Sequence, residues 1–245
     1  MRKSLVLVGA LTAVVVGVAC AKHHSGAGVV PPDVRDVERD GEGLVSATFG
    51  SYPARVPDWP RAATVDTLLK TVWNRAKQDF PQMPAASVAQ LDSAIAALDV
   101  AILATDQHAA VIAANQVGLA VPDLFASFHP DSPKQIVRMD AVFRQVGIDA
   151  HFADWPGATA DAASLTADWD ASKAAVHAKV PLCHRVGGTA TVEGDIDASL
   201  TNLATYVPAM LTTSSEVESE NGALEIDTLE LLYDCPPDEI GRAHV

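Results

Sequence analysis

The residues best suited to chemistry are polar side chains that recur at helical spacing within apolar segments. His108 and Asn115 are seven positions apart, and Asp140 and Arg144 are four apart, so each pair shares one side of a helix. Imidazole and carboxylate groups bind metal ions. One hypothesis is therefore that His108, His151 and Asp140 bind a metal ion or a small ligand inside a bundle. The alternative is a hydrogen-bonded core network, in which Asn115 fixes helix register and Asp140 neutralises Arg144.

No catalytic signature accompanies these residues. The histidines lack the His-Glu-x-x-His and Glu-x-x-His spacings of metal-binding helices, and no nucleophile elbow or phosphate loop is recognisable. Cys183-His184 matches the end of a c-type haem attachment motif, but Val180 replaces its first cysteine. We therefore expect a non-enzymatic protein without attached haem, for which a metal ion is the possible cofactor.

The elements that must position these side chains are helices, and the clearest is a hairpin from Ala85 to Phe128. Only Thr105 and Asp106 separate its two arms, and the Asp106 carboxylate is placed to cap the second arm. So short a connection turns the chain back on itself. The apolar stripe of the first arm consists of Val88, Leu91, Ile95, Leu98 and Ile102.

Helical periodicity also predicts the other elements. The expected helices are 60–80, 133–150, 158–176, 196–210 with a bend at Pro208, and 224–233. Short links make neighbours antiparallel, so we expect an all-α, up-and-down antiparallel bundle of about six to seven helices within residues 58–238. No internal repeat with a fixed period is visible.

The net charge of the chain indicates which classes of binding partner it disfavours. The chain of 245 residues has 17 basic and 31 acidic residues, a net charge of -14. Such a surface repels phosphate backbones, which argues against nucleic acid. Cations and basic proteins are better matched to it.

The N-terminus has the layout of an export signal. Arg2 and Lys3 precede an apolar run that ends at Ala19, and Cys20 follows. Residues 17–20 resemble a bacterial lipobox, which implies a signal peptide over 1–19 and a lipid anchor on Cys20. By the same analogy, Ala21 favours the periplasmic face of the outer membrane. The alternative is cleavage after Ala21 and secretion. Residues 20–57 show no sustained period and are expected to form a flexible tether.

Two further features concern the C-terminal part. In an exported protein Cys183 and Cys235 are expected to form a disulfide. Residues 239–245 look like a translated sequencing adapter and are expected not to be native.

Together these features suggest a non-enzymatic envelope lipoprotein whose bundle binds or scaffolds an envelope protein or a cell-wall component. The alternative is a periplasmic metal-binding or cofactor-binding bundle that uses its interior histidines.

Overall fold

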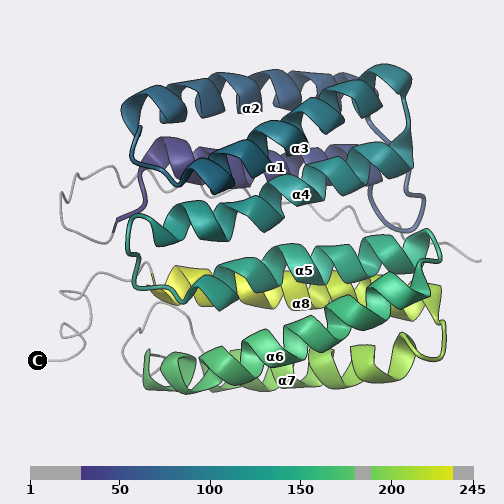
Figure 1. The fold of residues 1–245 in the computed structure, drawn as a ribbon. Helices are drawn as coiled ribbons and strands as arrows, with labels where there is room; N and C mark the ends of the chain where they lie inside the picture. The colour runs from purple at the N-terminus through teal and green to yellow at the C-terminus, as the bar shows by residue number, and fades with distance from the viewer. Residues whose placement is uncertain (1–28, 180–188, 234–245) are drawn as a thin grey trace, which may run out of the picture.

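The computed structural model of the protein describes residues 29–179 and 189–233. Within these ranges the chain forms eight α-helices and no strand. They are α1 (Pro32–Phe49), α2 (Trp59–Asp79), α3 (Ala85–Ala104), α4 (Gln107–Ala126), α5 (Lys134–His151), α6 (Trp155–Lys179), α7 (Thr189–Tyr206) and α8 (Thr212–Tyr233). Two groups of four are visible in Figure 1, with α1–α4 in one and α5–α8 in the other. The predicted all-α bundle is confirmed, with slightly more helices than expected.

The predicted hairpin is formed by α3 and α4. Thr105 adopts a left-handed conformation (φ 51°) that ends α3, and the Asp106 carboxylate accepts a hydrogen bond from the Ala109 N–H at 3.1 Å. Leu91 and Leu98 are fully buried. The stripe therefore faces the core, as its period predicted.

The predicted tether over 20–57 is wrong for residues 32–49, which form α1. Val34, Val37 and Leu44 are fully buried on it. The helical period is interrupted in the sequence by Gly41, which lies where α1 crosses α4 closely: a β-carbon there would sit 2.9 Å from Val117. Residues 20–28 lie outside the described residues.

Three predicted boundaries also change. α6 begins at Trp155, because the Asp154 carboxylate caps it and proline fits a first turn. α7 ends at Tyr206, so Pro208 follows the helix and does not bend it. α8 begins at Thr212, well before the predicted residue 224. Its early turns lack an apolar stripe because the buried residues there are polar: Ser215, Glu216 and Ser219.

The two groups of helices repeat one plan of packing, although the sequence shows no repeat with a fixed period. We call α1–α4 the first half and α5–α8 the second half. In each, the first helix packs on the second and fourth, and the third packs on the fourth. The sequences agree where the second helix begins: Asp58-Trp59-Pro60 in the first half and Asp154-Trp155-Pro156 in the second. Both aspartates cap their helix, at 3.1 Å from a backbone N–H.

A tryptophan clasp follows in each half at the same spacing. The Trp73 indole donates to Asp92 at 2.7 Å, and the Trp169 indole donates to Asp197 at 2.7 Å. A lysine one turn after each tryptophan pairs with the same aspartate. The clasp joins the second helix to the third in both halves. The sequence shows no fixed repeat period because the segment between the tryptophan and the aspartate is longer in the second half than in the first.

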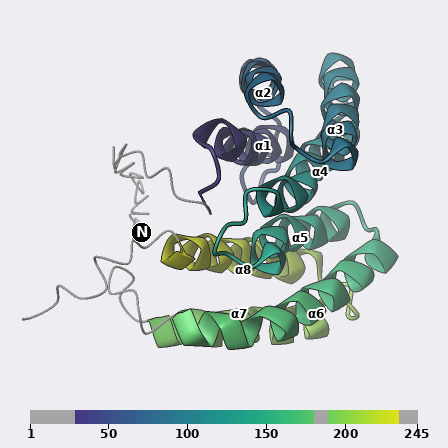
Figure 2. The same cartoon turned by 60° about the vertical axis from the view of Figure 1, so that its left-hand side comes forward.

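Each half has its own apolar core, and α4 packs on α5 to join them. Figure 2 shows the two groups stacked through this pair. By length and composition alone, two of the described helices, α3 and α4, could cross a membrane. α4 is mostly buried between α1, α3 and α5, which accounts for its apolar composition within the bundle.

Candidate functional site: a groove between the two halves

A groove lies where α1 of the first half faces α8 of the second, with α5 as its floor. Its volume is about 580 Å³, within the range of small-molecule sites. The walls combine apolar side chains with four acids and two arginines. The charged residues that line it are Glu42, Arg55, Arg144, Glu216, Glu220 and Asp227.

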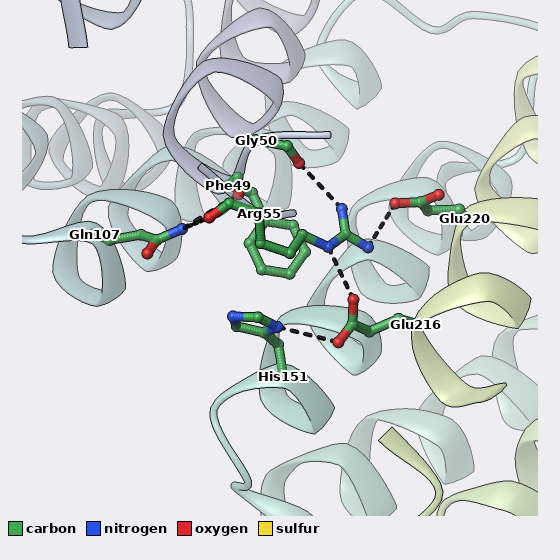
Figure 3. Close-up of polar contacts among 7 residues, drawn as sticks. All are labelled: Phe49, Gly50, Arg55, Gln107, His151, Glu216 and Glu220. Atoms are coloured by element: carbon green, nitrogen blue, oxygen red, sulfur yellow. Dashed lines mark hydrogen bonds and ion pairs between the residues drawn. The ribbon is translucent and has the colours of Figure 1, made fainter. Parts of the chain in front are cut away.

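Arg55 closes one end of the groove. Its guanidinium pairs with Glu216 at 2.8 Å and Glu220 at 2.7 Å, and it donates to the Gly50 carbonyl at 3.1 Å. Figure 3 shows these polar contacts of Arg55. The guanidinium also lies 4.1 Å from the centre of the Phe49 ring. The contacts with Glu216 and Glu220 tie the α1–α2 loop to α8, so the closed end joins the two halves.

The loop that carries Arg55 is held tightly. Arg55 is buried and has a positive φ of 46°, a conformation that costs a non-glycine residue free energy unless its surroundings fix it. The Gln107 amide donates to the carbonyls of Arg55 and Phe49, at 2.8 and 3.2 Å (Figure 3). The first turn of α4 therefore sets the position of the arginine.

Further along the groove, three carboxylates from three helices converge. Glu42 comes from α1, Asp140 from α5 and Asp227 from α8, and one oxygen of each lies within 4.8 Å of the others. Arg144 pairs with Asp140 at 2.5 Å and with Glu42 at 3.2 Å. The other Asp140 oxygen, Oδ1, is buried and has no hydrogen-bond partner. We call Glu42, Asp140 and Asp227 the carboxylate triad.

Crowding and burial disfavour negative charge around this triad. Burial, together with the nearby carboxylates of Glu42 and Asp140, raises the pKa of Glu38 to about 8. Burial also raises the pKa of Asp140 well above its ordinary value, although Arg144 opposes the rise. The pKa of Asp227 rises to about 6, through burial and then Glu42. The inner part of the groove therefore holds more acid than its arginine can neutralise.

The predicted grouping of His108, His151 and Asp140 does not form. Asp140 and His151 are eleven residues apart on α5, which separates them by about 16 Å along the helix axis. The Nδ1 of His151 lies 3.0 Å from Glu216, at the closed end of the groove (Figure 3). His108 is exposed and packs on the Phe152 ring, with centroids 4.1 Å apart. No single ion can contact all three residues.

The contacts that the alternative interpretation expects, a hydrogen bond from Asn115 and an ion pair between Asp140 and Arg144, are both present. The Asn115 amide donates to the Ala141 carbonyl and to Gln145, both at 2.9 Å. Gln145 in turn donates to Asp149 at 2.6 Å, so the network links α4 to the end of α5. Asp140 and Arg144 pair with each other, as their spacing predicted. Cys20, Cys183 and Cys235 lie outside the described residues, and their lipidation and disulfide remain predictions.

Several groove residues were missed by the sequence reasoning, although a signal was present. Glu216, Glu220 and Asp227 follow one another at steps of four and seven, which places them on one face of a helix. Glu38 and Glu42 are likewise four apart. Glu38, Glu42, Glu216 and Glu220 fell in segments that had not been predicted as helices, and Asp227 fell in the predicted helix 224–233, so the shared faces were not considered.

Comparison with known proteins identifies no relative. No protein-family model matches the chain, and neither the curated proteins nor the solved structures give a match. Function therefore has to be argued from the groove.

Proposed function

We propose that this protein is a non-enzymatic binding module of the cell envelope, held by a lipid on Cys20, whose groove between α1 and α8 binds a cationic ligand. The observation that carries the proposal is the charge of the groove: four lining acids against two arginines, with the Asp140 carboxylate beside them. A ligand that brings positive charge would relieve this imbalance.

The arginines do not favour an anionic ligand, because each guanidinium already pairs with two carboxylates. Arg55 contacts Glu216, Glu220 and the Gly50 carbonyl. Arg144 contacts Asp140 and Glu42. An anion would have to displace a carboxylate from one of them, which costs a buried ion pair. Acceptor oxygens, by contrast, remain available at the triad.

The apolar walls of the groove indicate that the ligand carries apolar groups beside its positive charges. Val45, Phe49 and Ile148 are buried against the groove, and Leu224 is exposed at its edge. A polyamine, with short methylene segments between ammonium groups, combines the two characters. Basic side chains of an envelope protein, or the amines of a cell-wall component, offer the same chemistry.

Calorimetry with spermidine, a linear polyamine, tests the groove. We expect saturable binding that weakens about tenfold in Glu220→Gln, since losing one partly desolvated charge contact costs about 1.4 kcal/mol. Glu218→Gln is the matched control, because Glu218 lies on the same helix but contacts Asn202 of α7. A dicarboxylate of similar length should not bind. Equal binding of the dicarboxylate, or equal weakening in both variants, would contradict the proposal.

Membrane attachment is tested separately by cell fractionation. Cys20→Ser should move the protein from the membrane fraction to the soluble fraction, because the variant has no thiol to acylate. An unchanged distribution would refute the lipid anchor without bearing on the groove.

A further inference from the structure

The inner end of the groove carries a more specific arrangement than the groove as a whole. Glu42, Asp140 and Asp227 come from three different helices, yet each offers an oxygen to one small volume. The donors are all carboxylate oxygens, the ligand type that hard divalent cations select. From this convergence we infer that the carboxylate triad is a calcium site. This inference rests on the proposed function, because it assigns a cation to the same groove.

The separation of the donors fits calcium. Calcium–oxygen distances are about 2.4 Å, so two ligands of one calcium ion lie at most about 4.8 Å apart. The triad oxygens lie within 4.8 Å of one another. Magnesium usually keeps several waters and takes only one or two carboxylates, whereas calcium accepts six to eight oxygen ligands in a flexible geometry. Water in the open groove can supply the remaining ligands of a calcium ion.

Asp140 provides the second, independent observation. This residue is 5% exposed, and its Oδ1 atom has no hydrogen-bond partner in the described part of the chain. A buried carboxylate oxygen without a partner is costly, and it is one of the few such atoms on this face. A bound cation would give this oxygen its partner while Oδ2 keeps its contact with Arg144.

Arg144 pairs with two members of the triad without using all of their oxygens. Its two nitrogens contact one oxygen of Asp140 and one of Glu42, which leaves the second oxygen of each carboxylate and both oxygens of Asp227 outside these contacts.

Equilibrium dialysis of the full chain against radioactive calcium tests this site. The protein is first treated with a chelator, and the salt concentration is kept near physiological. We expect one calcium ion per chain. Affinity should fall at least tenfold in Asp140→Asn and in Glu42→Gln, because each removes one charged ligand. Asp123→Asn removes an exposed carboxylate elsewhere and should bind as the wild type does.

Folding of each variant is checked by circular dichroism, and the half-exposed Glu42 provides a substitution that does not disturb the core. Absence of saturable binding up to about 10 mM, beyond the usual range of protein calcium sites, would overturn the inference. If spermidine still bound under those conditions, the proposed function would stand. Equal calcium binding by wild type, Asp140→Asn and Glu42→Gln would place the ion elsewhere and also overturn it.

Discussion

Asp149, at the end of α5, makes the stability of this bundle depend on pH near neutrality. Burial raises its pKa from the ordinary 3.8 to about 7, and the neighbouring Asp161 and Asp154 contribute to the rise. Asp149 accepts from Gln145 at 2.6 Å and, when protonated, can donate to Asp161. Between about pH 4 and pH 7, the folded state therefore keeps a proton on Asp149 that the unfolded chain has already released.

The sign and size of the effect follow from this difference. Because the folded pKa is raised, the stabilising contribution of Asp149 is fully present below pH 3.8 and is lost as the pH rises through about 7. One pKa unit corresponds to about 1.4 kcal/mol, so the loss is at most about 4 kcal/mol. Asp149→Asn keeps the shape, accepts from Gln145 and donates to Asp161 at every pH.

Urea unfolding followed by circular dichroism, at pH 5 and at pH 8, measures the consequence. We expect Asp149→Asn to gain about 2.7 kcal/mol relative to the wild type between pH 5 and pH 8. Only the two pKa units between pH 5 and the folded pKa of about 7 fall in this window, and the cost of burying the amide is the same at both pH values. Asp123→Asn, which removes an exposed acid, should follow the wild type. Parallel loss of stability in wild type and Asp149→Asn between the two pH values would refute the reasoning.

Three further predictions can be measured in the same unfolding assay. Gly222→Ala should destabilise the protein by about 2 kcal/mol, because the added β-carbon would overlap an α5 ring. Gly194→Ala should stabilise it by about 0.8 kcal/mol, because a β-carbon there meets nothing within 4 Å. A change of the same sign in both variants would contradict this reasoning. Asp92→Ala and Asp197→Ala should each cost about 1 kcal/mol and add in the double variant, since the two clasps are alike and lie in separate halves. Arg55→Ala should cost about 3 kcal/mol, because it leaves Glu216 buried without its cation, and a loss under 1 kcal/mol would show that the closed end is not held in this way.

Much of the fold could be predicted because the signals that define these helices are local in the sequence. The Leu91 and Leu98 stripe, the Asp106 cap and the pairing of Asp140 with Arg144 all depend on residues within a few turns of one another. Local spacing is sufficient for such contacts. α1 was not predicted because its apolar period is hard to recognise. Val34, Val37 and Leu44 keep helical spacing, but Gly41 and the surrounding charged residues resemble a linker.

The site was less predictable, because its residues are brought together by packing and not by spacing. The sequence identified Asp140 and Arg144 but grouped Asp140 with two histidines. His108 lies on α4, away from the groove, and His151 lies on the same helix as Asp140 but about three turns further along. Glu42 and Asp227 are far apart in the chain and meet only because both α1 and α8 face the same floor helix. Arg55 depends equally on its loop, whose position is fixed by Gln107 from another helix.

By itself, the sequence determined which side of most helices is apolar, where several helices begin, and that the chain is acidic. The tertiary structure alone decided that two four-helix halves stack through α4 and α5, and that acids from three helices share one groove. The physical reason is that a helix face is set by neighbours three and four residues away, whereas the meeting of distant carboxylates depends on how whole helices cross. That geometry is fixed only when buried residues such as Gly41 and Gly222 set how closely two backbones approach.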